Sequence, residues 1–266
     1  MIDNSEPVTV SELAARATTL RALHHQDSPL VLPNVWDAAS ARVVAEAGFP
    51  AMATGSEPVS QSLGYPDEEG APPEEMFAAA RRITSAVDVP VSVDAEAGYG
   101  LSAENLVGRL IAAGAAGCNL EDSDHANGGL VDADAHAERL AAVRRAATAA
   151  GVPLVINARV DVFIAEWGEP SQRLDEAVRR ARRYLEAGAD CVYPILASDT
   201  DTIGELTRRI DGPVNVLYRP GVPSLAELAR LGVARVTFGP FLQREVLATL
   251  RDMVTRLAAG DDPFRR

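Results

Sequence analysis

The chain has 266 residues, of which 38 are acidic and 25 are lysine or arginine, so its formal net charge is −13 at pH 7. A surface this acidic repels phosphate backbones and anionic lipids, which argues against nucleic-acid binding and membrane-surface binding. All 25 of the basic residues are arginine. The absence of lysine excludes Schiff-base enzymes, pyridoxal phosphate aldimines and P-loop nucleotide binding, because each requires a lysine amine.

Cys118 and Cys191 each lie within an apolar run, which is typical of small buried side chains and not of a disulfide or a zinc site. No apolar run approaches the roughly 20 residues that a membrane helix needs. Residues 1–7 are polar and acidic, and they lack the basic start and apolar core of a signal peptide. We therefore expect a cytoplasmic protein that does not span a membrane.

From residue 30 onward, short apolar runs alternate with amphipathic helical patterns, and Ala-Gly or Val-Pro pairs often separate them. A helix is also expected earlier, over residues 10–25, where it would lie against the rest of the protein. The segment 55–73 is rich in glycine, proline and serine and is predicted to be a long loop. In chain order, the strands are predicted at 30–33, 51–54, 91–94, 117–121, 154–158, 191–195, 214–217 and 235–238, and the helices that follow them at 38–48, 74–87, 103–114, 135–151, 172–188, 200–210, 225–232 and 241–259.

Eight short apolar runs with intervening helices favour a closed (β/α)8 barrel, in which helices cover a ring of parallel strands. An open, doubly wound sheet is less consistent with the sequence, since no Gly-x-Gly-x-x-Gly turn follows the first strand. No linker or change in composition divides the chain. We therefore expect a single α/β barrel domain over residues 1–266, with residues 1–28 as an N-terminal helical extension.

Active sites of (β/α)8 barrels lie where the strands end, and acidic residues follow two neighbouring strands here. Asp94 and Glu96 follow the third strand, and Glu121 ends the fourth. Oxygen ligands without cysteine or suitably spaced histidine favour a hard cation such as Mg2+, with Mn2+ as an alternative. An aspartate in this position can instead cap the next helix, but Ser102 is the better cap. The sequence therefore predicts a divalent-cation site at Asp94, Glu96 and Glu121.

Two basic groups near the same strand ends are candidates for catalysis. Arg159 ends the fifth apolar run, and a buried arginine needs an anionic partner, either an internal carboxylate or a carboxylate of the substrate. His125 follows the fourth strand, where a histidine could transfer protons near neutral pH; a solvated histidine without a role is the alternative. The arginines between 173 and 183 lie on a predicted helix, and we interpret them as its solvated outer face.

Five motifs follow one another at the predicted strand ends: Pro33-Asn34 with Trp36-Asp37, Thr54-Gly55-Ser56, SVDAEAGYG at 92–100, NLED at 119–122 and NARVD at 157–161. The most specific are the Asp-Ala-Glu-Ala-Gly-Tyr-Gly stretch and the Glu-Asp pair after it. Together the motifs resemble the isocitrate lyase/phosphoenolpyruvate mutase family, over roughly residues 23–250. The chain is identified by this resemblance as a member of the family, in its phosphonomutase-like branch.

Membership implies a (β/α)8 barrel whose last helix is exchanged between paired subunits, in a homodimer or a homotetramer. It also implies Mg2+ and chemistry on 2-oxo acids through a metal-stabilised enolate. By the resemblance, Asp94 is the direct metal ligand, and Glu96 and Glu121 hold metal-bound water.

The same resemblance assigns residues to the substrate, which is expected to be a small carboxylic acid. Thr54, Gly55 and Ser56 correspond to the cradle for its carboxylate and enolate oxygens. Arg159 corresponds to the arginine that contacts the same oxygens, and Asp67 falls near the loop aspartate of the family.

The segments that choose the substrate in this family differ here. The lyases carry Lys-Lys-Cys-Gly-His after the Glu-Asp pair, whereas residues 123–129 contain neither lysine nor cysteine. The lysine and the Asn-Ser of the phosphoenolpyruvate mutases are also missing. Ile195 and Leu217 stand where the lyases make polar contacts to the far end of their substrate. An anion facing them would be desolvated without a partner, so isocitrate is expected to be a poor substrate.

These features predict a Mg2+-dependent lyase that cleaves a carbon–carbon bond in a small 2-oxo or 2-hydroxy carboxylic acid, and that is not isocitrate lyase itself. Arg159, Glu121 and His125 are the predicted catalytic residues, and 122–130 is the predicted lid. Two alternatives remain: a mutase or hydrolase of carbon–phosphorus bonds, and a barrel that binds an oxo acid without catalysis. The acidic set favours an enzyme, since buried carboxylates are costly without a cation.

Overall fold

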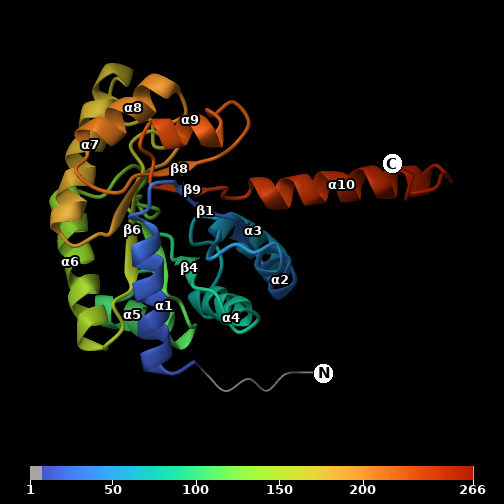
Figure 1. Cartoon of the computed structure of the whole chain (residues 1–266), viewed down its shortest axis with the longest axis horizontal. Coiled ribbons are helices and arrows are strands. Elements are labelled where there is room, and N and C mark those ends of the chain that lie inside the picture. Colours follow the sequence, from blue (N-terminus) through green and yellow to red (C-terminus); the bar gives the residue numbers. More distant parts are fainter. Residues whose placement is uncertain (1–7, 266) are drawn as a thin grey trace.

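Nine strands and ten helices follow one another along residues 8–265, the part of the chain that the computed structural model describes (Figure 1). All pairings between the strands are parallel, and most strand residues are buried, which explains the short continuous apolar runs of the sequence. The strands are β1 (Leu30–Leu32), β2 (Asn34–Val35), β3 (Met52–Thr54), β4 (Val91–Asp94), β5 (Gly117–Glu121), β6 (Val155–Val160), β7 (Cys191–Pro194), β8 (Asn215–Leu217) and β9 (Arg235–Thr237).

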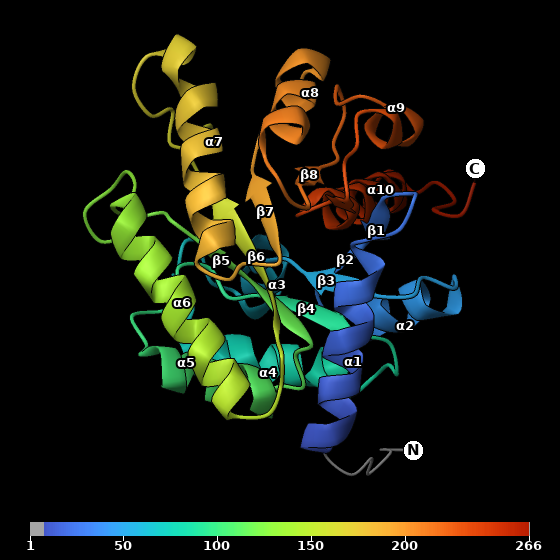
Figure 2. The same cartoon turned by 60° about the vertical axis from the view of Figure 1, so that its left-hand side comes forward.

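The first predicted strand is divided at Pro33, since proline has no N–H to donate to a neighbouring strand. β1 pairs with β9, whereas β2 pairs with β3. A parallel bridge between Val192 and Val214 joins β7 to β8. The strands therefore form a ring in chain order, which confirms the predicted (β/α)8 barrel (Figure 2).

One helix was not predicted. α3 forms within the segment that was expected to be a long loop. Its Pro58 lies in the first turn, where proline is tolerated, and Gly64 ends the helix with a φ of 89°. The helices are α1 (Val10–Leu23), α2 (Ala38–Glu46), α3 (Ser56–Leu63), α4 (Pro73–Thr84), α5 (Ala103–Ala112), α6 (Ala133–Ala149), α7 (Pro170–Glu186), α8 (Thr200–Arg209), α9 (Leu225–Arg230) and α10 (Phe241–Ala258).

Helix α1 lies against the amino-terminal end of the barrel. Its Leu13, Ala17 and Leu20 side chains are buried. Arg21 donates to the Asp190 Oδ1 (2.7 Å) and to the Pro153 carbonyl (3.0 Å), both just ahead of strands β7 and β6. The helix predicted over 10–25 is therefore present and anchored, while residues 1–7 of the predicted extension lie outside the described residues.

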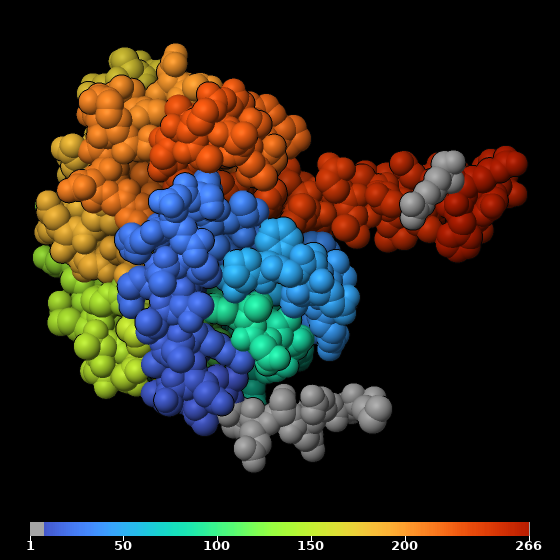
Figure 3. Space-filling view, viewed as in Figure 1, coloured from blue at the N-terminus to red at the C-terminus, as the bar shows by residue number. Residues whose placement is uncertain are grey.

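Helix α10 projects well beyond the rest of the molecule (Figures 1 and 3). Near its start, the Gln243 Nε2 donates to the Pro58 carbonyl (2.9 Å) and attaches the helix to α3. Further along, large apolar side chains are exposed on one face: Val246, Leu247, Leu250, Val254 and Leu257. Exchange of this helix between subunits stays a prediction.

No helix within residues 8–265 combines the length and the apolar character that crossing a bilayer requires. Cys118 and Cys191 are buried free thiols, as predicted.

His136 is buried on α6, at 2% exposure, and packs edge-to-face on Tyr184 with 4.8 Å between the ring centroids. Burial lowers the pKa of His136 to about 3, from an ordinary value of 6.5. Below pH 6.5, the unfolded chain therefore binds a proton that the folded protein does not bind. Between about pH 6 and the folded pKa of about 3, each unit of pH decrease should remove about 1.4 kcal/mol of unfolding free energy through this residue.

We expect His136→Phe to lose less unfolding free energy than the wild type between about pH 6 and pH 4.5, because phenylalanine keeps the ring contact and cannot be protonated. Urea unfolding at the two pH values measures both losses. Equal losses in the two proteins would contradict the prediction.

Candidate active site

A cavity of about 470 Å³ opens at the carboxyl ends of the strands. Thr54 lies behind its wall, at 3% exposure, and does not line it. The other residues predicted for the site all line the cavity: Gly55, Ser56, Asp67, Asp94, Glu96, Glu121, His125 and Arg159. Residues that are distant in the sequence are therefore brought together, because parallel strands deliver their carboxyl ends to the same side of the barrel.

Asp94 is held by two residues at the carboxyl end of the neighbouring strand β3. The Ser56 N–H donates to the Asp94 Oδ2 (3.1 Å), and the Asp94 N–H donates to the Thr54 Oγ1 (2.8 Å). Ser56 is the first residue of α3, so its N–H has no partner within the helix and is free to bind an anion. Thr54 thus holds the backbone of Asp94, and Ser56 orients the carboxylate that the sequence predicts as the metal ligand.

Glu96 occupies a tight turn after β4. Its φ of 49° lies in the left-handed region, which is costly for a residue with a side chain and is found mainly at functional sites. The Tyr99 hydroxyl donates to the Glu96 Oε1 (3.1 Å), and the Glu69 N–H donates to the Glu96 Oε2. The turn also needs Gly98, whose φ of 94° lies in the left-handed region that favours glycine. The strained turn and its two donors fix the Glu96 carboxylate in the cavity wall.

The acidic residues repel one another. Burial, followed by the charge of Asp94, raises the pKa of Glu96 to about 8, and the same causes raise the pKa of Asp67. Asp67 Oδ1 is buried and accepts no hydrogen bond from residues 8–265. A divalent cation would relieve this repulsion.

The geometry limits how a cation could be held. Within residues 8–265, no three acidic, histidine or cysteine side chains come close enough to bind one ion directly. Mg2+ keeps several of its waters in proteins and is usually bound through one or two carboxylates. The residues present therefore fit a hydrated cation bound at Asp94, with Glu96 and Glu121 able to hold its waters.

Glu121, at 3% exposure, lies between two cationic groups. The His125 Nε2 is 2.6 Å from the Glu121 Oε1 and forms a hydrogen bond with it. The Arg159 Nη2 is 2.5 Å from the Glu121 Oε2, and this contact is an ion pair whose angles do not fit a hydrogen bond. The hydrogen bond to Glu121 raises the pKa of His125 to about 9. Burial raises the pKa of Glu121, although the positive charge of Arg159 lowers it. His125 is therefore protonated at neutral pH, and not poised near neutrality as the sequence suggested.

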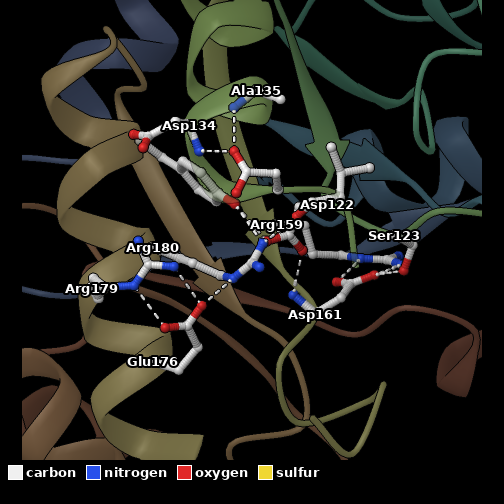
Figure 4. Close-up of polar contacts among 12 residues, drawn as sticks. Asp122, Ser123, Asp134, Ala135, Arg159, Asp161, Glu176, Arg179 and Arg180 are labelled. Atoms are coloured by element: carbon white, nitrogen blue, oxygen red, sulfur yellow. Dashed lines mark hydrogen bonds and ion pairs between the residues drawn. The ribbon is translucent and has the colours of Figure 1, made fainter. Parts of the chain in front are cut away.

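A network of hydrogen-bonded side chains, drawn in Figure 4, orients Arg159. The Asp161 carboxylate accepts two hydrogen bonds from the Arg159 guanidinium, each of 2.7 Å. The Ser123 hydroxyl donates to the same carboxylate (2.5 Å). The Asp161 N–H in turn donates to the Asp122 Oδ1 (2.8 Å). This bidentate clamp points the guanidinium at Glu121 and the cavity.

The interpretation of the arginines between 173 and 183 as a solvated outer face is wrong for Arg180. It is 5% exposed, and its guanidinium donates to the Asp122 Oδ2 (2.9 Å) and the Glu176 Oε1 (2.8 Å). The Tyr184 hydroxyl also donates to the Asp122 Oδ2 (2.6 Å). Glu176, Arg180 and Tyr184 recur every four residues, so they share one face of α7, and that face turns inward over the buried Asp122. The neighbouring Arg179 is exposed, as predicted.

Part of the cavity wall is apolar. Tyr193, Ile195 and Leu217 form a small buried cluster separate from the main core, and Leu196 and Phe241 pack against it. All five line the cavity, beside the charged groups. The apolar surface predicted from Ile195 and Leu217 is therefore present, and three further side chains extend it.

Several residues that line the cavity were given no role from the sequence, among them Phe241, Arg244 and Asn119. Phe241 and Arg244 belong to α10, which follows the last strand, and no sequence motif includes them. Asn119 lies two residues before Glu121 on β5. The two-residue period of a strand directs both side chains to the same face, and this was the signal available for Asn119.

A family model described as phosphoenolpyruvate phosphomutase matches residues 20–258. A Burkholderia cenocepacia protein of known structure is 44% identical, covers 90% of this chain and 99% of its own, and superposes with a TM-score of 0.85. The structure of 2,3-dimethylmalate lyase, a PEP mutase/isocitrate lyase superfamily member, is 28% identical over 94% of this chain and 90% of its own, with a TM-score of 0.81. The phosphoenolpyruvate phosphomutase of Streptomyces hygroscopicus is 31% identical over 90% of this chain and 79% of its own.

The family model covers nearly all of the barrel, and it includes every strand and the residues that line the charged side of the cavity. The chain therefore belongs to the phosphoenolpyruvate phosphomutase family, within the PEP mutase/isocitrate lyase superfamily, as the motifs at its strand ends predicted.

Proposed function

We propose that this protein is a Mg2+-dependent lyase that cleaves a carbon–carbon bond in a small 2-oxo or 2-hydroxy carboxylic acid with an apolar tail. The observation that carries the proposal is the composition of a single cavity. Arg159 provides positive charge for the acid end, Asp94 and Glu96 provide carboxylates for the cation, and Ile195 and Leu217 provide an apolar wall for the rest. Relatives named as 2-methylisocitrate lyases and 2,3-dimethylmalate lyase support a lyase reaction.

The residues of the chain itself bind the substrate and move its proton. The Arg159 guanidinium, preoriented by Asp161, donates to the substrate carboxylate. The positive amino-terminal end of α3 lies beside the same anion at Gly55, while the Ser56 N–H stays bonded to Asp94. In a 2-hydroxy acid, breaking the carbon–carbon bond turns the hydroxyl into a carbonyl and releases its proton, while the electron pair of the bond forms an enolate that takes up a proton on carbon. His125 lies in the cavity wall beside Glu121 and is the group that we assign to deliver it.

The family is metal-dependent, and the oxygen-rich wall suits that requirement. When bound at Asp94, with Glu96 and Glu121 holding its waters, the cation supplies positive charge that stabilises the negative charge of the enolate.

The proposal is tested by incubating the protein and Mg2+ with oxaloacetate, alkyl-substituted malates, isocitrate and 2-methylisocitrate, and by measuring the 2-oxo acid released. We expect the alkyl-substituted malates to have higher kcat/KM than isocitrate. Efficient isocitrate cleavage would contradict the apolar tail. Failure to cleave any of these acids, together with tight binding of one of them, would instead support a barrel that binds an oxo acid without catalysis.

We expect Leu217→Asn to lower kcat/KM for an alkyl-substituted malate by about tenfold, because an unpaired amide beside the alkyl group costs roughly 1–3 kcal/mol. Oxaloacetate, which lacks the alkyl group, should be affected less. Ile164→Asn is the matched control, since Ile164 lines the same cavity but is 45% exposed. Equal losses with both substrates would argue against the apolar wall as a specificity element.

Phosphoryl migration between carbon and oxygen is the second candidate reaction, and the Streptomyces hygroscopicus phosphomutase that aligns with 90% of this chain favours it. Phosphorus NMR of phosphoenolpyruvate incubated with the protein and Mg2+ distinguishes the two reactions. A phosphonate signal would identify a mutase, whereas an unchanged spectrum with active malate cleavage would identify a lyase.

We also propose that the exposed apolar face of α10 packs on a second copy of this chain. Four of its side chains, Val246, Leu250, Val254 and Leu257, are between 48% and 61% exposed. Burying each of them would contribute roughly 1.5–3 kcal/mol to association.

We expect the wild type to have the mass of a dimer or a tetramer by size-exclusion chromatography with light scattering. The double substitution Leu250→Asp and Val254→Asp should shift the mass to that of a monomer, because it places two charges in the apolar face. Asp252→Asn, on the opposite face of the helix, is the control and should leave the mass unchanged. A monomeric wild type would refute this assembly.

A further inference from the structure

Asn119 lies in the cavity floor, directly beside the residues already described. It is the register partner of Asp94 on β4 and of Asn157 on β6, so the three polar side chains form a row across neighbouring strands. Asn119 is 6% exposed and lines the cavity. Its amide is therefore within the same space as the substrate.

Two donors hold the oxygen of this amide. The Asn157 Nδ2 donates to the Asn119 Oδ1 (2.8 Å), and the Arg235 Nη2 lies 3.4 Å from the same oxygen. A guanidinium can only donate, so the atom that faces Arg235 must be the oxygen. The Asn119 NH2 group is consequently directed elsewhere, and it is the donor that remains for a molecule in the cavity.

Arg235 is a fully buried cation, at 0% exposure, and it does not line the cavity. Its Nε and Nη1 have no hydrogen-bond partner in the described part of the chain, and its other contact is the Ser92 Oγ at 3.4 Å. None of the ion pairs among residues 8–265 includes it. A buried charge without a counter-ion destabilises a fold, so stability does not account for this arginine.

We propose that the Asn119 amide donates a hydrogen bond to an oxygen of the bound carboxylic acid, and that Arg235 is the positioning residue that fixes this amide and adds positive charge beneath the substrate. The inference rests on the proposed function, because it takes the ligand of the cavity to be an anionic acid. It adds a donor to the floor of the site, below the wall formed by Arg159 and the acidic residues.

The test measures binding of oxalate to the Mg2+-loaded protein by calorimetry, together with the Tm of the protein without ligand. Oxalate is a small dianion that presents two adjacent oxygens, as the enolate of a 2-oxo acid does. We expect Asn119→Leu to weaken oxalate binding by about 10- to 100-fold, since it removes one hydrogen bond to a charged group. Arg235→Met should weaken it by about tenfold, while the Tm stays the same or rises as an unpaired buried charge is removed.

Ser92→Ala is the matched control, because it removes the other contact of Arg235 without touching the amide, and it should bind oxalate within about twofold of the wild type. Wild-type affinity in Asn119→Leu would overturn the assigned donor. A large fall in Tm, or failure to fold, in Arg235→Met would overturn the positioning role, and Asn119→Leu would then decide the donor alone. If the wild type itself does not bind oxalate with Mg2+, the proposed function fails, and this inference fails with it.

Discussion

Asp94→Asn should abolish both the activity and the stabilisation of this protein by Mg2+. At a Mg2+ concentration 100 times its Kd, binding contributes about 2.7 kcal/mol to the unfolding free energy, which raises the Tm of a domain of this size by roughly 5–10 °C. Asparagine retains the shape of Asp94 and can still contact the Ser56 and Thr54 groups, but it lacks the negative charge. Turnover should fall by roughly a thousandfold or more, since a bound cation contributes several kcal/mol of charge stabilisation.

The measurement is the Tm of each protein with and without Mg2+, followed by initial rates on the best substrate of the screen. Glu68→Gln is the matched control, because Glu68 is an exposed carboxylate that lines the same cavity, and it should keep the full Tm response. A Tm that still rises with Mg2+ in Asp94→Asn would place the cation elsewhere.

Arg180→Met should be the most destabilising of the substitutions considered, by about 3–5 kcal/mol. It leaves Asp122, at 0% exposure, without its cationic partner. The expected fall in Tm is roughly 6–20 °C. Activity at temperatures where the variant is folded should also fall, because Asp122 supports Asp161 and, through it, the orientation of Arg159.

Two further variants separate this effect from a general weakening of α7. Arg179→Met removes an exposed charge of the same helix and should change the unfolding free energy by at most about 1 kcal/mol. Adding Asp122→Asn to Arg180→Met removes the stranded charge and should restore part of the lost stability. If the double variant is less stable than Arg180→Met by the full cost of a second independent mutation, the two residues do not act as a pair. Urea unfolding of these four proteins, with Asp122→Asn alone as a fifth, completes the comparison.

The sequence alone was sufficient for the fold, and it identified most of the charged residues that line the cavity. Local patterns, namely short apolar runs and amphipathic helices with glycine at their ends, predict eight repeating units, and parallel units of this kind close into a barrel. Because a barrel delivers every strand end to one face, residues as distant as Ser56, Asp94 and Arg159 could be assigned to one cavity before any contact was known. These inferences depend only on period and position along the chain.

Side-chain orientation and electrostatics required the tertiary structure. Arg180 has the same local pattern as its exposed neighbour Arg179, and only the buried Asp122 behind α7 explains why one points inward. The raised pKa of His125 comes from its contact with Glu121. The apolar wall combines Tyr193, Leu217 and Phe241 from two strands and the final helix. Periodicity reports which face of an element is apolar, whereas the partner of a charged group, and hence its burial and its pKa, depends on residues that are distant in the chain and meet only when the barrel closes.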